Sequence, residues 1–97
     1  PQFVTVDTIQ QQVADHFRLH RSELIEKKRT KRIAVPRMIA IYLTKEMAGL
    51  SLKKIGECFG GRDHSTIIHA CEKIQKDRQK DPELNREIET LILELKK

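Results

Sequence analysis

The sequence has few of the residues that mark specialised classes of protein. It contains no tryptophan, and aromatic residues make up 4% of its 97 residues, so any hydrophobic core must be thin and mostly aliphatic. No apolar run approaches the roughly 20 residues needed to span a bilayer. The sequence also has no basic-then-apolar leader of the kind that marks a protein for export. Four glycines and three prolines are too few for a collagen-like, disordered or loop-dominated chain. These absences favour one compact helical domain.

Cysteine is also scarce. Cys58 and Cys71 both lie in apolar stretches, and a secreted domain of this size held by disulfides would carry more cysteines. We therefore expect two buried thiols in a reducing cytoplasm. Because the chain begins at Pro1 and not at a methionine, we also expect it to be excised from something longer.

Positive charge is in excess and is unevenly distributed. The net charge is +5, from 19 basic and 14 acidic residues. Residues 1–54 carry a net charge of +6, whereas residues 55–97 carry −1. The densest run is the basic loop, residues 27–32, with five cations in six positions. Such a run repels itself unless a polyanion neutralises it, and it fits a phosphate-contacting loop as well as a solvated turn.

Apolar residues recur at helical spacing along almost the whole chain, and no stretch alternates as a strand would. The pattern predicts six helices in one domain over residues 1–97. Four of them have the caps Asp7, Ser51, Asp63 and Asp81, the second begins near Ser22, and the third begins near Ile33 to Val35. Pro36 fits only the first turn of the third helix, which ends near Met47. The fifth helix ends near Gln75, and the last, residues 82–96, covers the core.

The most informative stretch is about residues 51–76, two helices joined by a glycine turn. In a helix-turn-helix the second helix enters the major groove of DNA by its N-terminal end. That end carries Asp63, His64, Ser65 and Thr66. A carboxylate can accept from cytosine, hydroxyls can bond either kind of base edge, and an imidazole can donate to a purine. The same residues would also suit a helix cap in a plain bundle, so the pattern alone leaves both interpretations open.

Further basic residues converge on the same side of this motif. Arg37 and Lys45 share the face of the third helix opposite its core stripe. Their separation of roughly 12 Å along the axis would let them meet separate phosphates. Lys53 and Lys54 lie at the start of the first motif helix, which typically crosses the DNA backbone. Arg29, in the basic loop, could reach into a minor groove.

Other classes of function fit the sequence less well. Asp63-His64-Ser65 is not a hydrolase triad, because adjacent residues of one helical turn cannot align as nucleophile, base and orienting group. Four residues could in principle bind a metal: Cys58, His64, His69 and Cys71. They include no Cys-x-x-Cys pair, and the two histidines lie off a common helical face. A protein-interaction bundle is the main alternative, and attraction of the basic loop to anionic lipid is another.

The stretch over residues 55–69, IGECFGGRDHSTIIH, closely resembles the signature of the C-terminal DNA-binding domain of the bacterial replication initiator family DnaA. Lys27-Lys28-Arg29 and Ala34-Val35-Pro36-Arg37 are similar to that family's basic loop and proline-containing helix. The resemblance extends from about Val4 into the last helix. It implies an all-α, six-helix bundle containing a helix-turn-helix similar to the Trp-repressor type. The function it implies is sequence-specific binding of double-stranded DNA at the DnaA boxes of the replication origin.

The resemblance also implies a role for each residue of the site. Arg29 would enter the minor groove, and four residues would read the major groove: Asp63, His64, Ser65 and Thr66. Phosphate binding or support of the interface is implied for Lys28, Arg37, Lys45, Lys53, Lys54 and His69. Ser65 departs from the family pattern, in which many members have threonine, so a methyl group that could meet thymine is absent.

Full-length members of the family carry an ATP-binding AAA+ module, so ATP and Mg²⁺ are expected for the full-length protein. This chain has no Gly-x-x-x-x-Gly-Lys-Ser/Thr sequence, and we expect it to hold no cofactor or metal and to catalyse no reaction. We expect the domain to be monomeric, bacterial, cytoplasmic and nucleoid-associated. Self-assembly and contact with acidic phospholipids are implied for the full-length protein.

Overall fold

All regular structure in the part of the chain that the structure describes is helical, as predicted. The computed structural model describes residues 4–27 and 30–97. The six helices in these ranges are α1 (Val6–His16), α2 (Arg21–Ile25), α3 (Lys31–Met47), α4 (Leu52–Cys58), α5 (His64–Lys80) and α6 (Pro82–Leu95). Their number and order confirm the predicted all-α architecture.

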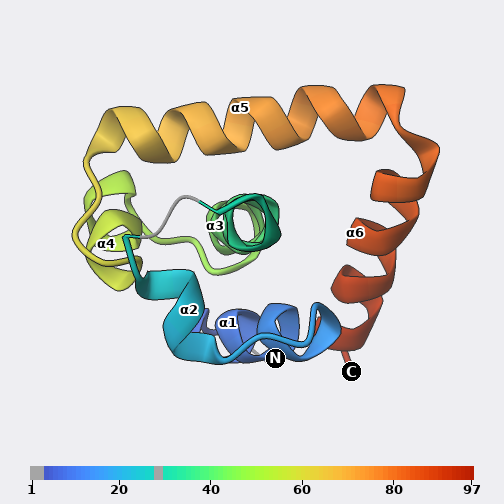
Figure 1. Cartoon of the computed structure of the whole chain (residues 1–97), viewed down its shortest axis with the longest axis horizontal. Coiled ribbons are helices and arrows are strands. Elements are labelled where there is room, and N and C mark those ends of the chain that lie inside the picture. The colour runs from blue at the N-terminus through green and yellow to red at the C-terminus, as the bar shows by residue number, and fades with distance from the viewer. Residues whose placement is uncertain (1–3, 28–29) are drawn as a thin grey trace.

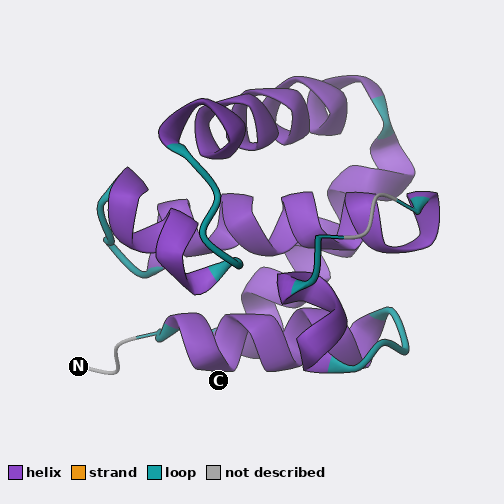
Figure 2. Ribbon diagram, turned by 60° about the vertical axis from the view of Figure 1, so that its left-hand side comes forward, coloured by secondary structure: helices purple, strands orange, loops and turns teal. Residues whose placement is uncertain are grey.

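The long helix α3 forms the centre of the fold. Figure 1 shows α3 end-on, with α5 above it, α1 and α2 below, α4 on one side and α6 on the other. Figure 2, turned by 60°, shows α5, α3 and α1 as successive layers. The most extensive packing of α3 is against α5 and α1. A helix enclosed in this way must be apolar on several faces, and residues 39–44 are indeed all buried.

The core is aliphatic, as the composition predicted. Among the described residues, Phe59 is the one aromatic side chain that is completely buried. It is joined by a set of fully enclosed aliphatic side chains that includes Ile9, Leu24, Ile39, Leu43, Ile55, Ile67, Ile74 and Ile88. The helix α6 contributes the buried side chains of Ile88, Leu91 and Leu95 to this core. No helix of residues 4–27 and 30–97 is long and apolar enough to cross a membrane.

Three of the predicted helix limits were wrong. Thr5, not Asp7, caps α1, since its side chain accepts from the Thr8 N–H at 3.2 Å. α2 begins at Arg21 after His20, which agrees with the predicted start near Ser22. α5 continues to Lys80, five residues beyond the predicted Gln75. The remaining difference is the start of α3.

α3 begins at Lys31, before the predicted start near Ile33 to Val35, so Pro36 lies inside the helix and not in its first turn. The Thr30 carbonyl accepts from the N–H groups of Ile33 and Ala34, at 3.0 and 2.9 Å, and starts the helix there. A proline at this depth removes one helical hydrogen bond. The burial of α3 on several sides offsets that loss.

The cysteine prediction was partly wrong. Cys58 and Cys71 are free thiols, but both are only half-buried. The inward stripe of α5 is Ile67, Ala70 and Ile74, and Cys71 lies at its edge. Burial still raises the pKa of the Cys71 thiol above its ordinary value.

The turn between α4 and α5 packs against the end of α2. Gly60 and Gly61 have φ angles of +83° and +77°, a region that favours glycine. A Cβ atom on Gly60 would lie 2.3 Å from the Ile25 carbonyl oxygen, whereas one on Gly61 would have no atom within 4 Å. The sequence predicted a sharp turn here, and the structure adds that the backbone at Gly60 approaches α2 too closely for any side chain.

These two glycines allow a matched test of that approach. Gly61→Ala should lower the free energy of unfolding by about 1–2 kcal/mol, because alanine is strained at this φ. Gly60→Ala carries the same strain and must also displace the Ile25 carbonyl, so its loss should be larger by at least about 1 kcal/mol. Urea denaturation measures both values. Equal losses in the two variants would show that the contact with α2 contributes nothing.

Candidate nucleic-acid interface

The N-terminal end of α5 is exposed. Asp63, His64, Ser65 and Thr66 are all solvent-exposed, and the next residue, Ile67, is fully buried. The step from exposed to buried residues follows from helical periodicity, since Ile67 begins the stripe that faces the core. The predicted exposure of this end, which we call the α5 tip, is confirmed. Its contacts with bases stay predictions.

Asp63 holds the α5 tip in shape. Its Oδ1 atom accepts hydrogen bonds from the Thr66 N–H and from the Thr66 hydroxyl, both at 3.0 Å. The two bonds hold the pKa of the Asp63 carboxyl below its ordinary value, the backbone bond being the larger cause. The predicted N-cap is therefore present.

α4 brings two lysines toward this tip. The Ser51 side chain caps α4 by accepting from the Lys54 N–H at 3.1 Å, as predicted, so Lys53 and Lys54 lie in the first turn. Lys53 borders an open hollow of about 520 Å³ together with Asp63, His64 and Ser65. The Lys54 ammonium lies 3.9 Å from a Glu57 carboxylate oxygen, and both side chains are exposed.

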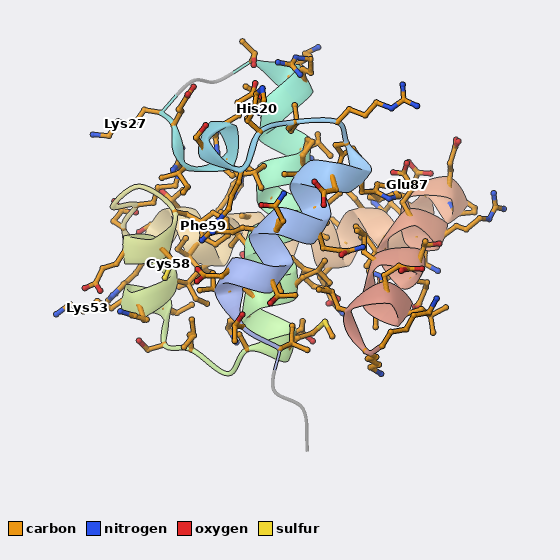
Figure 3. The ribbon with its side chains drawn as sticks, turned by 90° about the horizontal axis from the view of Figure 1, so that it is seen from below. His20, Lys27, Lys53, Cys58, Phe59 and Glu87 are labelled. Atoms are coloured by element: carbon orange, nitrogen blue, oxygen red, sulfur yellow. The ribbon has the colours of Figure 1, made fainter. Side chains whose placement is uncertain are left out.

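A second hollow lies between α3, the glycine turn and α5. It has a volume of about 340 Å³, and its lining includes Lys27, Arg37, Thr66 and His69. Lys27 is the first residue of the basic loop, so the loop begins beside the α5 tip. Figure 3 shows the labelled Lys27 and Lys53 side chains extending from the same side of the molecule. This side, with the α5 tip between two sources of positive charge, is the candidate interface.

The prediction that Arg37 projects from an outward face of α3 was wrong. Its side chain is 7% exposed. Its Nε donates to the Leu24 carbonyl at 3.0 Å, and its Nη2 donates to the carbonyls of Glu26 and Glu23 at 2.7 and 3.4 Å. The reason is that α2 covers the face of α3 opposite the core stripe. Arg37 therefore binds α2 and does not stand ready for a phosphate beside Lys45.

Lys45 and His69 are exposed, as the predicted phosphate contacts require. Lys45 lies on α3 close to α5, where its charge opposes the rise in the pKa of Cys71 that burial causes. His69 lies on α5 and borders the hollow that contains Thr66 and Lys27. Lys28 and Arg29, the remaining predicted DNA contacts, lie outside the described residues, and Lys27 and Thr30 flank them.

Sequence reasoning missed the role of Arg62. The sequence suggested only a turn residue, but its Nη2 donates to the Glu26 carbonyl at 2.8 Å and its Nη1 to the Ile25 carbonyl at 3.4 Å. Nη1 also donates to the Phe59 carbonyl within the turn itself. The α2 partners are 36 and 37 residues away in the chain, so no local pattern could have revealed them.

No group of three or more His, Cys, Asp or Glu side chains that could hold a metal ion occurs among residues 4–27 and 30–97. Cys58 and Cys71 belong to α4 and α5, and His64 and His69 border different hollows.

Comparisons with known proteins agree with this geometry. Residues 6–74 match the family described as Bacterial dnaA protein helix-turn-helix. A similar protein is the Chromosomal replication initiator protein DnaA of Symbiobacterium thermophilum, which is 48% identical over 96 residues. The match covers 99% of this chain and 21% of that protein, so the chain spans about a fifth of the relative's length.

The cap on α5 predicts a specific dependence of stability on pH. Because the folded-state pKa of Asp63 is lowered, its stabilisation is fully present above the ordinary value of 3.8 and is lost as the pH falls through the folded-state pKa. Asp63→Asn keeps a capping oxygen that does not titrate. The melting temperature of the wild type relative to this variant should therefore be constant from neutral pH to about pH 4 and fall at lower pH. Circular dichroism measures it. If the difference in melting temperature between the wild type and Asp63→Asn stayed constant down to about pH 2.5, the carboxylate of Asp63 would not act as a cap.

Proposed function

The chain belongs to the bacterial DnaA helix-turn-helix family, a family of DNA-binding domains in chromosomal replication initiation, and from this premise we propose that it binds specific double-stranded sequences, the DnaA boxes of a replication origin. α5 enters the major groove by its tip, and the basic loop enters the adjacent minor groove. The observation that most supports this function is the exposed, capped α5 tip with Lys53 on one side and Lys27 on the other.

The α5 tip has the chemistry needed to read base edges. His64 and Ser65 are exposed in the first turn, where a helix that enters the groove end-on meets the bases. Thr66 and Asp63 are linked to each other, so their remaining hydrogen-bonding atoms are held in fixed positions before DNA arrives. Such preorganisation reduces the entropy lost on binding. The tip therefore supplies the major-groove specificity.

The exposed cations surround the tip at the places where the DNA backbone must pass. Lys53 and Lys54 begin α4, the helix that crosses the backbone in this motif. Lys45 extends the positive surface along α3, His69 adds an exposed imidazole on α5, and Lys28 belongs to the sequence of the basic loop. Contacts of this kind fix the register of the protein on the duplex but carry little sequence information. The positive end of α5 also favours a nearby phosphate.

The remaining activities of the initiator belong to parts of the protein outside this chain. The chain spans about a fifth of its relative's length, and it lacks the phosphate-binding sequence that an ATPase module needs. We propose that ATP and Mg²⁺ binding, self-assembly and contact with acidic phospholipids reside there. The role of this chain is to bind DNA, at the nucleoid of a bacterial cell, without catalysis.

Substitutions in the two proposed reading elements should reduce specificity. Arg29→Ala and His64→Ala should each weaken binding to the cognate duplex by about 1–3 kcal/mol and weaken binding to a scrambled duplex much less. Fluorescence anisotropy at one fixed salt concentration measures both affinities. Arg86→Ala, at an exposed position of α6, is the control and should change neither value. Equal losses on both duplexes would mean that Arg29 and His64 do not read bases.

Lys45 should behave as a phosphate contact. Lys45→Ala should weaken binding to all duplexes to a similar extent and reduce the slope of log affinity against log salt by about one unit, because one fewer counterion is released. Lys80→Ala removes an exposed lysine at the far end of α5 and should leave the slope unchanged. If the Lys45→Ala slope equals that of the wild type, Lys45 does not contact the backbone.

A further inference from the structure

Two arginine side chains meet at the C-terminal end of α2, where the basic loop begins. The last carbonyl groups of any α-helix have no partner within the helix. α2 has five residues, and the Ser22 carbonyl already accepts from the Glu26 N–H at 3.2 Å. The next four carbonyls, those of residues 23–26, all accept from a guanidinium group of Arg37 or Arg62.

The two guanidinium groups share one acceptor. The Glu26 carbonyl accepts from Nη2 of Arg37 at 2.7 Å and from Nη2 of Arg62 at 2.8 Å. Two cations this close repel each other, and the nearby Arg62 charge is one reason why the pKa of Arg37 is lowered, after burial. The partial negative charge at the end of α2 offsets part of that repulsion.

A helix end can be satisfied far more simply. A glycine in the left-handed conformation caps many helices and needs no buried charge. Stabilisation of a five-residue helix alone therefore does not account for two converging arginines. What the arrangement adds is a link between segments that are far apart in the chain. Arg37 comes from α3, and Arg62 comes from the turn of the helix-turn-helix.

Arg62 connects the α5 tip and the basic loop, the two elements that we propose to read DNA, through very few bonds. It directly precedes Asp63, the cap of α5, and it binds the carbonyl of Glu26, which directly precedes Lys27 in the basic loop. Its own position is fixed by the hydrogen bond to Phe59 inside the turn and by the close approach of Gly60 to Ile25. The start of the basic loop is thereby held at one place relative to the α5 tip.

We propose that Arg62 is a positioning residue for DNA binding, which holds the start of the basic loop so that the minor-groove and major-groove contacts form together. This inference rests on the proposed function, because it assumes that the loop enters the minor groove. Without the link, the loop would lose more conformational entropy on binding. Its minor-groove contacts would then weaken, while the contacts of the α5 tip would remain.

The test compares the minor-groove discrimination of the wild type with that of Arg62→Lys. The lysine keeps the positive charge but lacks the planar fork that reaches both carbonyls. The first probe is a duplex that the wild type selects from a random pool. The other probes are copies of that duplex, in each of which diaminopurine replaces one adenine. Diaminopurine paired with thymine adds an amino group in the minor groove and leaves the major-groove pattern of adenine in place.

The wild type should bind at least one diaminopurine duplex about tenfold more weakly than the selected duplex. Arg62→Lys should bind the selected duplex about tenfold more weakly than the wild type does. The variant should bind every diaminopurine duplex as tightly as it binds the selected duplex. Its discrimination against base changes in the major groove should persist. Arg78→Lys is the matched control, since Arg78 donates to three side chains at the opposite end of α5. That variant should keep the minor-groove discrimination.

The outcomes separate this inference from the proposed function. If the wild type itself tolerates every diaminopurine, the minor-groove role of the loop fails, and the inference fails with it. If the wild type discriminates and Arg62→Lys discriminates equally, only the inference is overturned.

Amide hydrogen exchange of the free proteins distinguishes positioning from general stability. In Arg62→Lys, exchange of the Glu26 amide should accelerate about tenfold, while the amides of Ile74 and Leu91 in the core keep their protection. An equal acceleration at all three amides would assign Arg62 a general structural role and overturn the inference.

Discussion

The carbonyl groups at the end of α2 impose the constraint on which the rest of the arrangement depends. They lie against α3 and the glycine turn, where they need donors. Arg37 and Arg62 supply these donors, and in doing so they join α2, α3 and the turn before α5. The absence of a Cβ on Gly60 allows the turn to come close enough. One local need for hydrogen bonds therefore sets the relative position of the two elements that we propose to contact DNA.

Local signals in the sequence predicted the helices and the exposed end of the site. Ser51 and Asp63 act as caps because their side chains and the N–H groups they bind are three residues apart, a spacing visible in any sequence. The exposure of His64 and the burial of Ile67 follow from the same helical period. The start of α3 was misplaced because the rule for Pro36 reflects the preference of an isolated helix. In the folded protein, packing on several sides outweighs one lost hydrogen bond.

The roles of Arg37 and Arg62 could not be predicted in this way. An arginine opposite the core stripe of a helix is ordinarily exposed, and the sequence does not reveal that α2 covers this face of α3. The partners of Arg62 are backbone carbonyls, which every residue has, at a distance of 36 or 37 residues in the chain. Contacts of this kind depend on the tertiary fold. They carry no signature in residue type or spacing.

The proposed mode of binding requires the α5 tip and the start of the basic loop to contact one duplex at the same time. Amide chemical shifts, followed by NMR during titration with a single cognate duplex, report on both segments in one experiment. The signals of His64, Ser65, Lys27 and Thr30 should change together, with one apparent affinity, while those of the outer face of α6 stay unchanged. Changes confined to α6, or different affinities for the tip and for the loop, would contradict it.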